Sequence, residues 1–181
     1  MFNSNDESRT MTAHQVDAFR FSGRLIKKLV LEEIDAAAPV QSIPWVAPIK
    51  PLSQSRVALL TTAGISMQDD APFDMDGERA NPNWGDPSWR KIRADASGNT
   101  IAVNHLHIDT GYIERDINVA LPLQRLADLA DAGVIASSAP NHYSIMGFQG
   151  HDSSTLENVS GPEIAEAMRA EAVDLVLLAP V

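Results

Sequence analysis

Two histidines and an aspartate alternate in the stretch "HLHIDTGY", at His105, His107 and Asp109. Side chains two residues apart project from the same face of a β-strand, so a strand here would bring all three together. Imidazole and carboxylate groups are ligands that suit zinc or iron. Because patterns this short often match by chance, we favour a polar catalytic or structural cluster over a metal site and assign no metal.

A further histidine lies in the stretch "NHYSIMG", residues 141–147, which we predict to be a loop that follows a strand. His142 could serve there as a general acid or base, since the unperturbed pKa of imidazole lies near neutral pH. The competing interpretation is a histidine that only hydrogen-bonds the loop backbone. The residues alone do not separate the two.

Several kinds of chemistry lose their usual sequence support. The 181 residues contain no cysteine, which excludes disulfides, thiolate zinc sites and cysteine nucleophiles within them. No G-x-S-x-G, P-loop or G-x-G-x-x-G pattern occurs, so nothing points to a serine hydrolase or a nucleotide site. The acidic stretch "DDAPFDMDGE" does not match a calcium loop, because Pro72 and Asn83 stand where acidic ligands are required.

Strand and helix patterns alternate along the second part of the chain. The apolar runs that we predict as strands are "SRVALLTT", "TIAVNHLHI", "VIASSA" and "VDLVLLAPV". The amphipathic stretches "LPLQRLADLADAG" and "GPEIAEAMRAEA" predict helices, each with a proline near its start. This alternation indicates βαβ units, so the predicted fold class is α/β: an open, mainly parallel sheet with helices on both faces, in a doubly wound sandwich.

In such a sheet, ligands bind beyond the carboxyl ends of the strands. The first predicted strand ends at Thr61 and Thr62, and Gly64 follows. We therefore predict that these residues line the site. The long segment 63–98 adds to this expectation, since loops of that length in compact domains are usually functional or disordered.

The chain is predicted to have two parts. Residues 1–50 form an N-terminal helical arm and a proline-rich linker, because apolar residues recur at helical spacing up to Ile34 and four prolines follow in "APVQSIPWVAPIKPL". Residues 51–181 form the α/β domain. We expect this domain to be incomplete at its C-terminus, because the chain stops directly after the apolar run "VDLVLLAPV".

The formal net charge of −10 disfavours partners that require clustered positive charge, which excludes nucleic acid and anionic membrane surfaces. No stretch approaches the ~20 apolar residues of a membrane span. The N-terminus, "MFNSNDESRT", is polar and carries acids, unlike a signal or transit peptide. The expected location is the cytoplasm.

Taken together, six blocks resemble the B-component selenoprotein family of the glycine, sarcosine, betaine and D-proline reductases. They are "RVALLTTAGI", "APFD", "GDPSWRKI", "NHLHIDTGYIERDINVALPLQRLADLADAGVI", "SAPNHYSIMG" and "VDLVLLAPV", and they cover roughly residues 50–181. "HIDTGYIERDIN" and "APNHYSIMG" look most like the D-proline reductase branch. In that family the last strand runs into selenocysteine or cysteine, two residues and a cysteine, and a helix follows. The resemblance therefore implies a selenocysteine directly after Val181, at a UGA codon read as a stop.

The same resemblance implies an activity. The chain would belong to a selenol- or thiol-dependent oxidoreductase subunit that reductively cleaves a C–N bond alpha to a carboxylate, in an amino acid or related amine. A partner subunit with a pyruvoyl group would bind the substrate amine, and the selenolate would attack the alpha carbon before a thiol resolves the adduct. The chain itself is expected to hold no cofactor, to be inert without the selenocysteine, and to form an oligomer.

Residue roles follow from this activity. The catalytic candidates are His142, His105, His107, Asp109, Asp116 and Tyr143. A histidine would protonate the departing amine or stabilise the selenolate, and Asp109 or Asp116 would orient that histidine. The substrate-binding candidates are Thr61, Thr62, Gly64, Asn141 and Ser144.

Two other functions stay open at the level of sequence. One is a metal-dependent hydrolase or lyase that uses His105, His107 and Asp109. The other is a non-catalytic binding subunit. Metal analysis, selenium labelling and co-purification of partners would separate these functions from the reductase.

Overall fold

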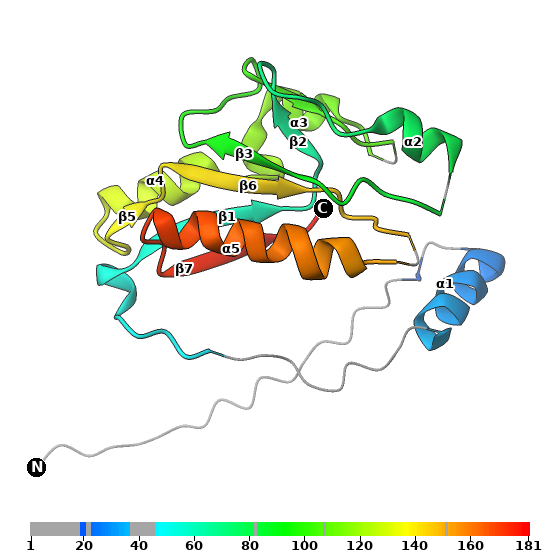
Figure 1. Cartoon of the computed structure of the whole chain (residues 1–181), viewed down its shortest axis with the longest axis horizontal. Helices are drawn as coiled ribbons and strands as arrows, with labels where there is room; N and C mark the ends of the chain where they lie inside the picture. Colours follow the sequence, from blue (N-terminus) through cyan, green and yellow to red (C-terminus); the bar gives the residue numbers. More distant parts are fainter. Residues whose placement is uncertain (1–18, 21–22, 37–45, 82, 107, 151) are drawn as a thin grey trace, which may run out of the picture. The chain divides into compact units, whose positions relative to one another are not determined.

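The computed structural model describes residues 19–20, 23–36, 46–81, 83–106, 108–150 and 152–181 (Figure 1). The chain divides into two units, Met1–Val46 and Ala47–Val181. In the first unit, helix α1 spans Arg24–Ala36 and begins directly after Gly23. None of the described helices combines the length and the apolar character that crossing a membrane requires.

The second unit is built around β1, Arg56–Thr61, the central strand of a mostly parallel sheet. β7, Leu175–Ala179, pairs with one edge of β1 in parallel. The other edge of β1 is shared by β5, Ser137–Ser138, and then by β6, Asn141–Ile145, both parallel to it. β3, Trp89–Arg93, extends this side of the sheet as an antiparallel neighbour of β6.

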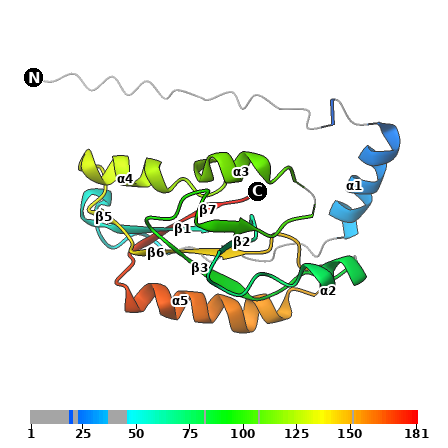
Figure 2. The ribbon, with the colours of Figure 1, turned by 90° about the horizontal axis from the view of Figure 1, so that it is seen from above.

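Helices cover both faces of this sheet, as Figure 2 shows. On one face lie α3, Gly111–Arg115, and α4, Leu123–Asp131, whose apolar side chains pack with Val57 and Leu59 of β1. On the other face lies α5, Gly161–Ala170, which packs with Ala58 and Leu60. Because successive strand side chains point to opposite faces, the apolar run Val57–Leu60 of β1 supplies apolar side chains to both layers.

Shorter elements complete the unit. β2, Ile65–Met67, and β4, Ile101–Val103, form a separate antiparallel pair. The remaining elements are the 3₁₀ turns Leu52–Gln54 and Ile117–Val119, helix α2, Met75–Ala80, and the π-helical turn Leu156–Ser160 that leads into α5. The predicted α/β class, with an open and mainly parallel sheet between helices, is confirmed.

Two of the predicted strands are placed differently. "TIAVNHLHI" is a strand only over Ile101–Val103, and it lies outside the main sheet, paired with β2. Asn104 ends this strand: its backbone N–H donates to the carbonyl oxygen of Gly64 at 2.8 Å, and its Nδ2 donates to the same oxygen at 3.1 Å. His105 and Asp109 therefore do not alternate along one strand.

The predicted third strand, "VIASSA", is reduced to the two residues of β5, and the main strand is β6, which we had predicted as a loop. The break between them falls at Ala139 and Pro140. Proline has no N–H to donate to a ladder, so the pairing with β1 cannot continue through it. The loop at the carboxyl end of this strand is thus Met146–Phe148 and not residues 141–147.

Candidate functional site

The connections that leave β1 and β6 pass over opposite faces of the sheet. The chain from β1 passes through β2, α2, β3 and β4 and then reaches β5 over the face that carries α3 and α4, whereas β6 leads through α5 on the other face to β7 (Figures 1 and 2). In open α/β sheets, ligands bind in the crevice at the carboxyl ends of two neighbouring strands whose connections diverge in this way. We call the residues that follow β1, β6 and β7 at this end the rim. They are Thr62–Gly64, Met146–Phe148 and Pro180–Val181.

One side chain joins two of the rim segments. The Oγ1 of Thr62 accepts a hydrogen bond from the backbone N–H of Val181 at 2.9 Å and donates to the carbonyl oxygen of Val181 at 3.3 Å. Gly147 approaches Thr62 from the other side, and a Cβ added to Gly147 would lie 3.2 Å from the Cβ of Thr62. Thr62 is therefore held between β6 and β7, and it holds the backbone of Val181 in place.

The loop after β1 is packed tightly at Gly64. Its φ is +63°, in the left-handed region, and a Cβ there would lie 2.4 Å from the Asn104 carbonyl oxygen and 2.5 Å from the Met146 Sδ. Only glycine fits such a position without a shift of its neighbours. Gly64 therefore shapes the rim by letting three backbone segments approach.

Two predicted substrate-binding hydroxyls lie beneath the rim and not on it. Thr61 and Ser144 are fully buried. The Oγ1 of Thr61 accepts from the Ala63 N–H at 3.2 Å, and the Oγ of Ser144 accepts from the Ile65 N–H at 2.8 Å. Both hydroxyls accept hydrogen bonds from backbone N–H groups in or next to the loop after β1, and they thereby hold that loop in place.

A pocket of about 450 Å³ borders this loop. It is lined by Pro72, Phe73, Asp74, Met75, Asp76, Arg79 and Asn104. Asn104 connects it to the rim through its hydrogen bonds to Gly64. Both ribbon views place α2, which carries Asp76 and Arg79, on the side of the sheet where β1 and β6 end.

The wall of the pocket is held by an arginine that does not line it. Arg90 stacks its guanidinium 4.4 Å from the ring centroid of Phe73 and donates to the carbonyl oxygens of Ala71 and Pro72 at 2.6 and 2.8 Å. The Nη1 of Arg79 pairs with Asp76 at 2.8 Å. An exposed guanidinium, two carboxylates and an apolar wall are thus arranged around one space, which suits a small zwitterion.

His142 lies inside the sheet. Its side chain is fully buried, its Nδ1 accepts the N–H of Leu59 at 3.0 Å, and its Nε2 lies 3.2 Å from the Oγ of Ser138. Because Nδ1 accepts, the ring proton is assigned to Nε2, which donates to Ser138. Burial lowers the pKa of His142 to about 4, although the carboxylate of Glu171 opposes the shift. Between β5 and β6, where β1 has no paired strand residue on this edge, the ring accepts the backbone N–H of Leu59. This contact favours a structural role for His142. Its catalytic role stays a prediction.

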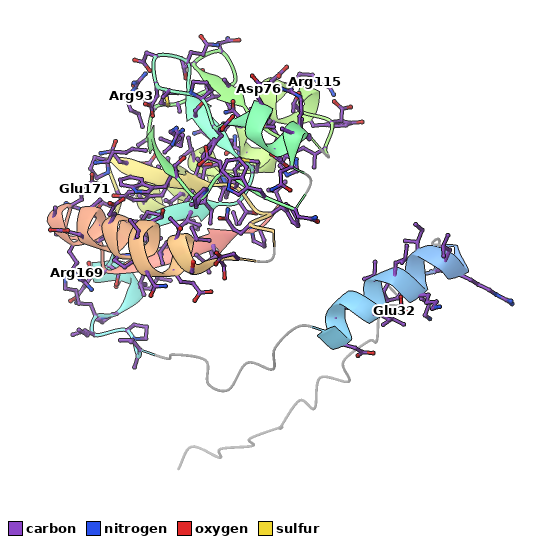
Figure 3. The ribbon with its side chains drawn as sticks, turned by 45° about the vertical axis from the view of Figure 1, so that its right-hand side comes forward. Glu32, Asp76, Arg93, Arg115, Arg169 and Glu171 are labelled. Atoms are coloured by element: carbon purple, nitrogen blue, oxygen red, sulfur yellow. The ribbon has the colours of Figure 1, made fainter. Side chains whose placement is uncertain are left out.

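Asn141 and Tyr143 point away from the rim. Both lie near Glu171, whose Oε1 accepts from Asn141 Nδ2 at 2.8 Å and whose carbonyl oxygen accepts from Arg56, the first residue of β1. Figure 3 places Glu171 at the end of α5, far from Asp76 on α2. Burial, followed by the charge of Glu171, raises the pKa of Tyr143 to about 12. The structure therefore does not bring these two residues together with Thr62.

The remaining acidic candidates are engaged locally. Asp109 is exposed and accepts from the Gly111 N–H at 3.0 Å. Asp116 accepts from both the backbone and the side chain of Asn118, and these hydrogen bonds hold its pKa below the usual range. Among the described residues, no three histidine, cysteine or acidic side chains are grouped as a metal site would require. His107 lies outside the described residues, so the predicted trio with His105 is not tested.

Sequence reasoning did not identify several residues that matter here. Gly147 and Met146 close the rim from β6, and Arg79, Asp76 and Asn104 line the adjoining pocket. The sequence offered a weak signal only for Gly147, as a glycine directly after an apolar run. Asn104 is placed beside the rim by its hydrogen bond to Gly64, which lies 40 residues earlier in the sequence. A local pattern of residues gives no sign of such a contact.

Comparisons with known proteins point in one direction. The family model described as glycine/sarcosine/betaine reductase selenoprotein B matches residues 5–181. The chain is 37% identical over 134 residues to the D-proline reductase subunit gamma of Acetoanaerobium sticklandii. That match covers 74% of this chain and 52% of the relative, so the chain spans about half the length of that relative. No solved structure matches the chain.

The buried neutral state of His142 predicts a pH-dependent stability. Its pKa is about 4 in the folded protein against 6.5 for the free side chain, so between these values the unfolded chain binds the proton more readily. The free energy of unfolding should therefore fall as the pH drops through this window, by roughly 3 kcal/mol in total. Urea unfolding at pH 7 and pH 5 measures the effect, and His142→Asn, which keeps an acceptor for Leu59, should reduce it. Equal pH dependence in both proteins would contradict the assignment.

Proposed function

The chain belongs to the glycine/sarcosine/betaine reductase selenoprotein B family, and on this premise we propose that it is part of a selenol- or thiol-dependent reductase subunit. The reaction would be the reductive cleavage of a C–N bond in an amino acid or related amine. The relative named D-proline reductase subunit gamma supports a cyclic or secondary amino acid as substrate. The main support for the proposal is that the hydroxyl of Thr62 hydrogen-bonds both the N–H and the carbonyl oxygen of Val181 at the rim.

We place the redox residue, a selenocysteine, directly after Val181. The surroundings fit such a group, because Thr62 fixes the backbone immediately before it and Gly147 adds no side chain to the space. The rim segments contain no acidic residue, and a carboxylate there would oppose a selenolate. Selenocysteine at this position supplies a nucleophile that is ionised at neutral pH and is regenerated by exchange with a thiol.

The residues at the rim and beneath it would then position the redox residue. Thr62 and Gly147 hold the end of β7 against β1 and β6, and the buried hydroxyls of Thr61 and Ser144 keep the loop after β1 in place. His105 and Asp109 stay candidates for moving a proton to the departing amine. A partner subunit that carries a pyruvoyl group would bind the substrate amine.

We propose that the pocket beside the rim receives the substrate. Arg79 would offer a guanidinium to the substrate carboxylate, Asp76 or Asp74 would face the positively charged nitrogen of the attached substrate, and Phe73 and Met75 would contact the carbon skeleton. A pocket of about 450 Å³ is large enough for one small amino acid together with the group to which its amine is attached.

The position of the redox residue makes a direct prediction. The codon after that of Val181 should be TGA, followed in frame by a cysteine codon three positions later. Growth of the native host with radioactive selenium should label a polypeptide that reacts with antibodies against residues 56–181. A different stop codon, or an unlabelled product, would contradict the selenocysteine, and a cysteine codon at that place would convert the proposal to its thiol form.

Removing the hydroxyl of Thr62 should slow the reaction. In the full-length enzyme, Thr62→Val loses both hydrogen bonds to Val181, and with a net value of about 1 kcal/mol per bond we expect kcat to fall roughly thirtyfold. KM should stay near its original value, because Thr62 positions the redox residue and does not bind substrate. Thr62→Ser keeps the hydroxyl and serves as the matched control. An unchanged kcat in Thr62→Val would contradict the proposed role of Thr62 in positioning the redox residue.

The pocket makes a separate prediction about substrate binding. Arg79→Gln should raise KM for the amino acid substrate by ten- to a hundredfold, as expected for the loss of a charge-assisted hydrogen bond of about 1.5–3 kcal/mol. Arg115→Gln removes another exposed guanidinium, which stacks on Tyr112, and should leave KM unchanged. Steady-state kinetics of the assembled reductase measures both. An unaltered KM in Arg79→Gln excludes this pocket as the carboxylate site.

A further inference from the structure

β7 has one edge without a strand partner in the described part of the chain. Its residues Leu175–Ala179 pair with Val57–Thr61 of β1, and the sheet order gives β7 no second neighbour. The carbonyl oxygen of Ala179 accepts from the N–H of Thr62, so the backbone groups of Ala179 point towards β1. Because backbone groups alternate in direction along a strand, those of Leu175 and Leu177 also point towards β1, in agreement with the register in which Ala58 lies opposite Val176, and the N–H groups of Val176 and Leu178 point outwards.

This free edge is apolar, which sets it apart from ordinary edge strands. The sequence of β7 is LVLLA, with no charge and no proline, and Val176, Leu177 and Leu178 are 43%, 53% and 63% exposed. Edge strands are normally protected by charged side chains, prolines or bulges. Strands with apolar residues on both faces are typical of the interior of parallel sheets.

The two faces beside β7 carry open grooves. The groove on the α4 face has a volume of about 290 Å³ and is lined only by apolar side chains, among them Leu52, Leu129 and Leu177. The groove on the α5 face has a volume of about 180 Å³ and includes Met168, Val173 and Val176. A strand that joined the edge would need a cover on each of these faces.

We propose that β7 is an interior strand of the complete sheet, and that its free edge binds a parallel, apolar strand from a part of the same polypeptide outside residues 1–181. The length of the relative supports this occupant, because 48% of that protein lies outside the matched 52%. A second copy of the chain is disfavoured, since each copy carries a net charge of −10 and two copies repel. The inference rests on the sheet and does not depend on the identity of the redox residue.

The topology also assigns the face for the connecting helix. The connection from β6 crosses β1 to reach β7 and carries α5 on one face, whereas the connection from β1 towards β5 runs the opposite way with α4 on the other face. Crossovers between parallel strands share one hand, so connections that run in the same direction lie on the same face. A connection from β7 to a strand beyond its free edge continues the direction of α5. Its helix would therefore lie beside α5, over the groove at Met168 and Val176.

Amide hydrogen exchange on the protein encoded by the complete gene tests this inference. The amides of Val176 and Leu178 should exchange at least a hundredfold more slowly than their intrinsic rates, because a new strand would accept their N–H groups. The amides of Leu175 and Leu177 point to β1 and are the internal control, expected to be protected in any case. Fast exchange at Val176 and Leu178 with protection at Leu175 and Leu177 would overturn the proposal.

The same measurement separates the other occupants. Protection at Leu178 that disappears on dilution, together with dissociation seen by light scattering, would assign the edge to a second copy and overturn the proposal. Protection of Leu178 that requires an added partner subunit would also overturn it. Protection of Leu178 in a monomer without any partner supports the proposal, and this result stands whether or not selenium is found in the protein.

Discussion

The pairing of β1 is the constraint on which the rest of the domain depends. β1 is buried between helices on both faces, and its backbone N–H and C=O groups have no access to water there, so each unpaired group would cost stability. β7 pairs along one edge of β1. On the other edge the ladder is interrupted at Ala139 and Pro140, and the interruption is bridged by the imidazole of His142, which accepts the N–H of Leu59. A histidine thus acts as part of the ladder, and β5 and β6 can both lie against the same strand.

The same pairing creates the candidate site. Three parallel strands that are hydrogen-bonded in register end at the same edge of the sheet, so Thr62, Gly147 and Val181 meet although they are far apart in the sequence. The connections that lead to β5 and to β7 lie on opposite faces of the sheet. At this edge Thr62 hydrogen-bonds Val181. The family membership suggests what this arrangement is for. A redox residue at the end of β7 would lie at the carboxyl ends of the strands, where such sheets bind ligands.

The acidic pocket beside the rim and the apolar edge of β7 show two different kinds of surface. The pocket is built from residues of one loop and a short helix that Arg90 holds in place, and its charges are suited to a small polar ligand. The edge of β7 is apolar on both faces and offers backbone hydrogen-bonding groups, which suit another strand. The chemistry of each surface follows from which backbone groups are already paired. Ala71 and Pro72 have their carbonyl oxygens bound by Arg90, whereas the outer groups of β7 have no strand beside them among the described residues.

The sequence by itself determined the fold class and the family. The apolar runs at Val57–Leu60 and Leu175–Leu178 were readable as strands, the proline-led helices as their crossovers, and the combined blocks as the reductase family, because these signals are local and each is complete within a short stretch. It also pointed to Thr62 and Gly64 at a strand end. The tertiary structure decided which of the polar residues meet. The first five residues of "NHYSIMG", Asn141–Ile145, form a strand because Leu60 and Thr61 of β1 pair with it, and this places His142 in the core and Asn141 at the opposite end of the sheet. The cause is long-range pairing: the direction in which a strand side chain points depends on its register with a neighbour, and a local pattern of residues carries no information about that neighbour.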